Sequence, residues 1–90
     1  MISKTARKDD LFKAILKLET IDDCYKFFDD LCTIKEIDSM AQRIAAAKLL
    51  IDGKTYEQII AATEISSATL SRVSKCVQYG KGYKKVLKDE

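Results

Sequence analysis

Ninety residues suffice for one domain, and the absence of proline together with only 3 glycines excludes the turn-rich sequence of an all-β chain. With 47% apolar and 33% charged residues, the composition instead favours a compact all-helical domain that spans residues 1–90. A domain this small buries only a modest fraction of its surface alone, and the formal net charge of +2 says little until it is divided along the chain.

The chain is predicted to begin with an arm and a short helix. Residues 1–8 are polar and basic with little to pack, so we expect a mobile arm. Asp9 and Asp10 suit the N-terminal end of a helix dipole. A wide apolar face follows over about ten residues, formed by Leu11, Phe12, Ile15, Leu16 and Leu18.

A second helix is predicted after Thr20, whose hydroxyl caps it, with Asp22 and Asp23 in its first turn. Phe27 falls outside its apolar stripe, so this helix is apolar over more of its surface than a surface helix of a monomer. We therefore expect a partner subunit to complete the core of the dimerisation and core helices, residues 9–53. The stripe itself consists of Ile21, Cys24, Tyr25, Phe28, Leu31 and Cys32.

The longest predicted helix runs from Ile34 to Asp52. Thr33 and Glu36 form a capping box at its start, and Gly53 is expected to end it as a C-terminal cap. Residues 45–47 are alanines, which permit close approach of another helix. Helical spacing predicts an inward stripe of Ile34, Ile37, Met40, Ala41, Ile44, Ala47 or Lys48, and Ile51.

Residues 54–79 predict two short helices joined by a tight turn. Thr55 and Gln58 form a capping box for the first, and Ser66 or Ser67 caps the second. The turn, residues 63–66, has Glu64 where a glycine is common. The expected inward residues are Ile59, Ile60 and Ala62 in the first helix and Leu70, Val73 and Val77 in the second.

This arrangement is typical of a helix-turn-helix, in which the second helix places its N-terminal residues against base edges in the major groove. Small residues allow close approach, Thr69 offers a hydroxyl to a base or a methyl to thymine, and Arg72 and Lys75 can reach guanine or phosphate. An ordinary helical hairpin with solvated serines is the alternative. The candidate DNA contacts are Lys54, Thr55, Gln58, Ser66, Ser67, Ala68, Thr69, Ser71, Arg72 and Lys75.

The charge is divided unevenly along the chain. Residues 20–38 hold 6 acids and 2 lysines, whereas residues 65–88 hold 6 lysines or arginines and no acid. The basic C-terminal third points to a polyanion, although the last lysines also fit a solvated tail. Gly80 and Gly82 end the second motif helix, and a last helix is predicted over 83–89, with Tyr83, Val86 and Leu87 covering the core.

The same sequence argues against an enzyme and against a metal or cofactor site. It contains no histidine and no phosphate-binding glycine loop, and neighbouring acids such as Asp22 and Asp23 do not face one another on a helix. The three cysteines match no zinc pattern; Cys24 and Cys32 are expected as buried thiols in a reducing compartment. With no signal peptide and no membrane-spanning run, we expect a cytoplasmic protein.

Three runs carry a family resemblance: TIKEIDSMAQR at 33–43, LLIDGKT at 49–55 and SATLSRVS at 67–74. Together they resemble the Trp-repressor superfamily, and within it the Trp-repressor-like branch labelled YerC/YecD. The resemblance implies an all-α domain of about six helices, an intertwined homodimer whose N-terminal helices interlock, and operator binding by a helix-turn-helix.

The resemblance also implies an effector site. The tryptophan-binding member of the family holds its corepressor with two arginines, a threonine, a glycine and a serine. Arg43, Arg72 and Thr33 match the arginines and the threonine, so they mark a possible effector pocket. Val73 replaces the glycine and Cys76 the serine, which removes space for an indole and a partner for an ammonium group. We therefore expect no tryptophan binding; Arg43 is then a helix-surface or interhelical charge.

The sequence thus predicts a homodimeric, sequence-specific transcriptional regulator that binds double-stranded DNA, acting as a repressor. The alternative is a dimeric helical protein-interaction module without DNA binding, which has no need for the acid-free run over residues 65–88. A third hypothesis keeps DNA binding but makes it constitutive, with no small-molecule effector.

Overall fold

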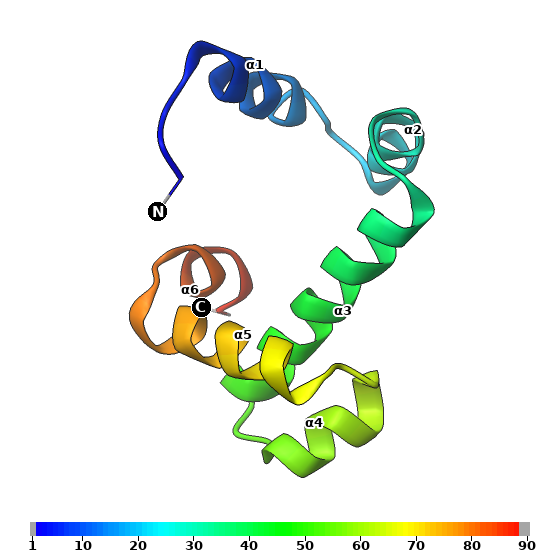
Figure 1. The fold of residues 1–90 in the computed structure, drawn as a ribbon. Coiled ribbons are helices and arrows are strands. Elements are labelled where there is room, and N and C mark those ends of the chain that lie inside the picture. The colour runs from blue at the N-terminus through cyan, green and yellow to red at the C-terminus, as the bar shows by residue number, and fades with distance from the viewer. Residues whose placement is uncertain (1, 89–90) are drawn as a thin grey trace. The chain divides into compact units, whose positions relative to one another are not determined.

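The computed structural model describes residues 2–88, which form six α-helices and contain no strand (Figure 1). This confirms the all-helical fold class that the sequence predicted. The helices are α1 (Ala6–Ile15), α2 (Ile21–Leu31), α3 (Ile34–Ile51), α4 (Tyr56–Thr63), α5 (Ser67–Tyr79) and α6 (Gly82–Leu87).

Contacts within the chain divide it into two compact units. The first unit, Met1–Ile34, contains α1 and α2; the second unit, Lys35–Glu90, contains nearly all of α3 together with α4, α5 and α6. The sequence predicted one domain for the whole chain, and the division falls at the start of its longest helix. None of the helices between residues 2 and 88 is both long and apolar enough to cross a membrane.

The helix α1 begins one turn earlier than the sequence predicted. Thr5 is its N-cap, and the Thr5 hydroxyl accepts a hydrogen bond from the backbone N–H of Lys8 at 3.2 Å. The Lys8 ammonium donates to the Ser3 carbonyl at 2.9 Å, which ties the preceding segment to the helix. Residues 6–8 of the predicted arm are therefore helical, because the threonine satisfies a backbone donor that the arm prediction left out. Met1 lies outside the described residues.

The helix α2 begins as predicted, with Thr20 as its N-cap. The Thr20 hydroxyl accepts from the Asp23 N–H at 3.0 Å, and the Asp23 carboxylate accepts from the Glu19 N–H at 3.1 Å. These reciprocal bonds satisfy backbone donors on both sides of the helix start. Asp22 and Lys26 form an exposed i,i+4 ion pair at 3.0 Å, which contributes about 0.3–0.5 kcal/mol at most.

Neither α1 nor α2 contains a buried residue. The apolar residues predicted for these two helices are half-buried or exposed within this chain, and Leu16 and Leu18 of the first predicted face lie beyond the end of α1. Leu16 is 82% exposed, Ile21 77% and Tyr25 75%. Phe27 and Phe28 are half-buried and meet edge to face, with ring centroids 5.5 Å apart.

The second unit has a core of its own. Its buried apolar residues are Ala46, Ala47, Ile59, Ile65, Leu70 and Val73. Partly buried side chains pack against this cluster from each of the four helices: Leu49, Leu50, Ile60, Val77, Tyr83 and Leu87. Burial of this kind is worth roughly 1.5–3 kcal/mol for each large aliphatic side chain, so this cluster stabilises the unit.

The inward stripe predicted for α3 was partly wrong. Ile34 is 79% exposed and Ile44 also belongs to the exposed class, whereas the buried residues of α3 are Ala46 and Ala47. Ala47, a member of the predicted stripe, is buried, and Ile37, Met40 and Ile51 are half-buried. Ala46 is buried next to Ala47, as expected for alanines that permit close approach of another helix.

The end of α3 follows the predicted glycine cap. Gly53 has φ +86°, and its N–H donates to the Leu50 carbonyl at 3.0 Å while the Lys54 N–H donates to the Leu49 carbonyl at 3.0 Å. These bonds satisfy carbonyls that the helix leaves without partners, and only glycine adopts the left-handed conformation without steric cost. The helix ends at Ile51, one residue before the predicted boundary.

The last helix, α6, packs onto α5. A Cβ atom at Gly80 would lie 2.6 Å from the Cys76 carbonyl oxygen, so only glycine fits where the chain leaves α5. The Lys84 ammonium then donates to the Gln78 carbonyl at 3.0 Å. Tyr83 and Leu87 pack against the core as predicted, but Val86, also expected to cover the core, is 77% exposed. Residue 89, the predicted end of the helix, lies outside the described residues.

Candidate nucleic-acid interface

The helix α4 starts with the capping box that the sequence predicted. The Thr55 N–H donates to the Gln58 side-chain oxygen at 2.9 Å, and the Gln58 N–H donates to the Thr55 hydroxyl at 3.2 Å. Ile59 is buried and Ile60 packs against the core, both as expected. Ala62 was expected to face inward as well but is exposed.

The turn between α4 and α5 uses a strained residue. Glu64 caps α4 with φ 61° and ψ 19°, the left-handed conformation, and its N–H donates to the Ile60 carbonyl at 2.8 Å. This conformation costs a residue other than glycine roughly 1–3 kcal/mol. The next residue, Ile65, is buried and holds the turn against the core. Sequence reasoning treated Ile65 as part of the turn and missed this anchoring role, since a single apolar residue in a loop has no periodicity to reveal it.

Hydrogen bonds around Thr63 join α3, the end of α4 and the turn that follows it. The Thr63 hydroxyl donates to the Ile59 carbonyl at 2.7 Å and accepts from the Ile65 N–H at 3.3 Å. The Thr63 carbonyl accepts from the side-chain amide of Gln42, on α3, at 3.0 Å. The role of Gln42 was also not predicted from the sequence, because a single amide side chain in a helix does not indicate which distant carbonyl it will bind.

The helix α5 begins with a hydroxyl pair. Ser66 is its N-cap; the Ser66 hydroxyl accepts from the Thr69 N–H at 3.2 Å and donates to the Thr69 hydroxyl oxygen at 2.9 Å. The Ser66 proton is therefore used within the chain. Thr69, which is half-buried, still has its own hydroxyl proton to donate.

The two faces of α5 differ as the sequence predicted. Leu70, Val73 and Ser74 are buried, and Val77 packs against the core. The opposite side is exposed and consists of Ser67, Ala68, Ser71, Arg72 and Lys75. This exposed side carries hydroxyl and cationic donors, one methyl group and no carboxylate. Such a surface can bind phosphate oxygens and the acceptor atoms of base edges.

The candidate DNA-contacting residues before α5 are exposed, but two of them also form hydrogen bonds that stabilise the start of α4. Thr55 and Gln58 commit a hydroxyl oxygen and an amide oxygen to the capping box. The Thr55 proton and the Gln58 amide nitrogen remain as donors, and Lys54 adds a cation just before the helix. All three therefore present donors, like the exposed side of α5. Their contact with DNA stays a prediction, as it does for the residues of α5.

The predicted effector residues are spread over both units. Thr33 lies in the first unit, whereas Arg43, half-buried on α3, and Arg72, exposed on α5, lie in the second. Val73 stands where the tryptophan-binding family member has a glycine. It is a core residue with 1% of its surface exposed, so its side chain occupies space that a glycine would leave empty. Cys76 is half-buried, as are Cys24 and Cys32, and all three are free thiols. The expectation of buried thiols at residues 24 and 32 was thus only partly met.

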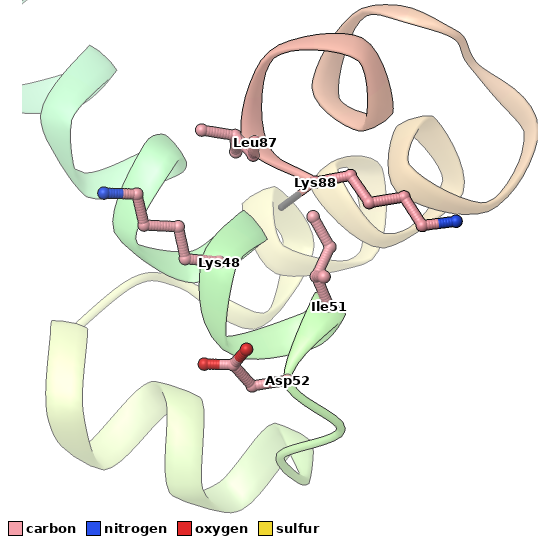
Figure 2. Close-up of a pocket in the computed structure, with 5 residues that line it drawn as sticks. All are labelled: Lys48, Ile51, Asp52, Leu87 and Lys88. Atoms are coloured by element: carbon pink, nitrogen blue, oxygen red, sulfur yellow. The ribbon is translucent and has the colours of Figure 1, made fainter. Parts of the chain in front are cut away.

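A surface pocket of about 410 Å³ lies between the C-terminal end of α3 and α6 (Figure 2). It is lined by Lys48, Ile51, Asp52, Leu87 and Lys88 and contains none of the predicted effector residues. Figure 2 shows the ammonium ends of the two lysines pointing away from each other. The lining thus offers two aliphatic side chains but no convergent set of polar groups.

Comparisons with known proteins agree on one family. The model of the family described as Trp repressor protein matches residues 6–90. The protein YerC of Bacillus subtilis (strain 168), described as uncharacterized, is 53% identical over 72 residues, which cover 80% of this chain and 69% of that protein. The resemblance inferred from residues 33–43, 49–55 and 67–74 is confirmed.

Solved structures show the same fold. A proposed Trp repressor from Staphylococcus aureus is similar with a TM-score of 0.89 and 46% sequence identity, covering 93% of this chain and 85% of that chain. A TrpR-like protein from Eubacterium eligens ATCC 27750 is similar with a TM-score of 0.88 and 46% identity, covering 92% of this chain and 87% of that chain.

Proposed function

Because this chain belongs to the Trp repressor family, we propose that it is a sequence-specific DNA-binding transcriptional regulator that acts in the cytoplasm as a homodimer. In this proposal α4 lies across the DNA backbone and α5 enters the major groove, as in other helix-turn-helix proteins. Regulation takes the form of repression, in which the bound dimer occludes the operator. No catalytic role is proposed.

The observation that carries the proposal is the exposed side of α5. Its small residues Ser67 and Ala68 lie in the first turn, where a reading helix must come close to base edges, and Arg72 and Lys75 follow at the next turn. No acid occurs between residues 65 and 88, so nothing on this part of the chain repels phosphate. Arg72 is the residue best suited to a bidentate contact with guanine.

The homodimer is supported by the apolar surface that the chain leaves uncovered. Leu16, which directly follows α1, and Ile21 and Tyr25 on α2 expose most of their surface. On α3, Ile34 and Ile44 are also exposed within this chain. An uncovered apolar area of this extent is typical of a protein-protein interface, and a second copy of the same chain supplies a matching surface in a two-fold symmetric pair.

Selection of bound duplexes from a random pool tests the proposal directly. We expect a two-fold symmetric site whose half-sites lie one helical turn apart, about 34 Å. If each subunit neutralises about three or four phosphates, the slope of log K against log salt should be near −6 for the dimer. A pool that yields no enriched sequence, together with binding that is insensitive to salt, would instead favour the protein-interaction module.

A tryptophan corepressor is not part of the proposal. The Val73 side chain belongs to the core of the second unit, so it cannot move aside for an indole without opening a cavity there. Calorimetric titration with L-tryptophan should therefore show no saturable binding at micromolar to millimolar concentrations. A clean binding isotherm would contradict this and would direct attention to Thr33, Arg43 and Arg72.

A further inference from the structure

A side chain of α3 reaches the turn of the helix-turn-helix directly. The Gln42 amide nitrogen lies 3.0 Å from the Thr63 carbonyl oxygen, and the two residues are 21 positions apart in the chain. Both are half-buried, so the bond is partly shielded from water. Thr63 is the last residue of α4, and the final carbonyls of a helix have no partner inside it. Gln42 supplies that partner.

The position of Thr63 determines where α5 begins. The Thr63 hydroxyl holds the Ile59 carbonyl at 2.7 Å and the Ile65 N–H at 3.3 Å, so one residue connects the end of α4 to the start of the next segment. Ile65 is buried, and Ser66 directly after it caps α5. A displacement of the Thr63 carbonyl therefore moves the N-terminal end of α5, the part that carries Ser67.

We propose that Gln42 is a positioning residue for DNA recognition: it sets the orientation of α4 and α5 relative to α3 through the Thr63 carbonyl. This inference rests on the proposed function, because orientation matters only if α5 reads a base sequence. Specific contacts require the two reading helices of a dimer to keep a fixed spacing, whereas contacts with phosphates tolerate small rotations. Gln42 is thus expected to govern specificity more than overall attraction to DNA.

The first experiment measures the ratio of specific to non-specific DNA affinity, using the selected site and a scrambled duplex. Gln42→Met keeps the length of the side chain but removes the donor, and it should lower this ratio about fivefold to tenfold, the effect of losing one hydrogen bond. Gln78→Met is the matched control, since Gln78 is exposed and makes no side-chain hydrogen bond within residues 2–88. Leu87→Ala is the stability control, because it weakens the core from α6, far along the chain from the turn.

The second experiment asks whether the donor itself matters. Gln42→Lys keeps a donor that can reach a helix C-terminal carbonyl, so it should recover most of the ratio. Gln42→Glu has the shape of glutamine but presents an acceptor to an acceptor, so it should lose more than Gln42→Met. Gln78→Lys and Gln78→Glu are the charge controls: they measure how the same change in charge alters DNA affinity when the turn between α4 and α5 is unchanged.

The third experiment does not depend on DNA. Residual dipolar couplings of backbone N–H groups give the orientation of α4 and α5 against α3 in the full chain. We expect Gln42→Met to rotate the pair while Gln78→Met and Leu87→Ala leave it unchanged. Unchanged couplings in Gln42→Met, or a loss of specificity no greater than that of Leu87→Ala, would overturn the inference. If the wild-type chain selects no DNA site, the proposed function fails, whereas the couplings still decide whether Gln42 sets the orientation.

Discussion

The two units of this chain use similar apolar side chains in opposite ways. In the second unit, Ile59, Ile65, Leu70 and Val73 are buried against one another. In the first unit, α1 and α2 contain no buried residue, although their sequences also place large apolar residues at helical spacing. An apolar stripe with helical spacing therefore does not show whether the same chain will cover that side of the helix.

The difference separates two kinds of stability. The second unit contains the contacts that hold it together, so its folding should depend little on protein concentration. The first unit exposes its large apolar residues within the single chain, so its stability should come from association, which makes it depend on concentration. The proposed DNA-reading helix α5 belongs to the self-sufficient unit, and the proposed dimer surface belongs mainly to the other.

The largest expected effect is that of a charge placed on the first unit. Ile21→Asp removes an exposed isoleucine from α2 and should weaken the homodimer by about 3–6 kcal/mol, because each copy loses about 1.5–3 kcal/mol of burial and a two-fold interface loses it twice. Sedimentation velocity should show monomers at concentrations where we expect the wild type to form the proposed dimer. Far-ultraviolet circular dichroism should show that the second unit keeps its helices.

A control for that variant is available in the second unit. Tyr79→Asp changes a residue that is 82% exposed, comparable to Ile21, but lies at the end of α5. It should leave the sedimentation coefficient of the dimer unchanged. If both variants dissociate the dimer equally, or if neither does, the proposal that the dimer surface lies mainly in the first unit would be wrong.

The next effect is expected in the core of the second unit. Leu70 is fully buried, and Leu70→Ala should reduce the free energy of unfolding by about 2–5 kcal/mol through lost burial and the cavity that remains. Chemical denaturation measures the loss. It should be nearly the same at two widely separated protein concentrations, whereas the destabilisation by Ile21→Asp should grow as concentration rises, because the wild type gains more from association than the variant does. A Leu70→Ala loss that varies strongly with concentration would contradict the self-sufficiency of this unit.

A smaller effect is expected on DNA binding alone. Arg72 is exposed on α5, so Arg72→Ala should leave stability almost unchanged but cost about 1–3 kcal/mol of binding to the selected site if the arginine meets a guanine. Binding measured against single-base variants of the site should then show relaxed specificity at one base pair. A uniform loss across all sequences, with a salt slope smaller by about 2 for the dimer, about 1 from each subunit, would identify Arg72 as a phosphate contact instead.

Much of the local structure could be predicted because it depends on neighbours in sequence. The caps at Thr20, Thr55 and Ser66 and the glycine that ends α3 each follow from residues at most five positions apart. The exposed and buried sides of α5 followed from helical spacing. The start of α1 was missed because Thr5 lies in a segment with too few apolar residues to indicate packing.

What could not be predicted depends on contacts between distant residues. Helical periodicity placed Ala47 in the inward stripe of α3, but it could not show that Ile34 and Ile44 of the same stripe would be exposed within this chain. The bond from Gln42 to Thr63 spans 21 residues and leaves no local signature. Most of the candidate DNA contacts on α5 lie on its exposed side, as predicted, but the use of Ser66 as a donor to Thr69 required the structure.

The smallest expected effect tests the strain in the turn. Glu64 adopts φ 61°, a conformation that glycine adopts freely, so Glu64→Gly relieves strain while adding flexibility to the unfolded chain. The balance should raise the free energy of unfolding by about 0.5–1 kcal/mol. Because the turn lies wholly in the second unit, the gain should be independent of concentration and the dimer dissociation constant should not change. Glu64→Ala is the matched control, since it removes the carboxylate but keeps the strain, and it should give no such gain. A gain of equal size in both variants would trace the effect to the charge of Glu64 and not to its backbone conformation.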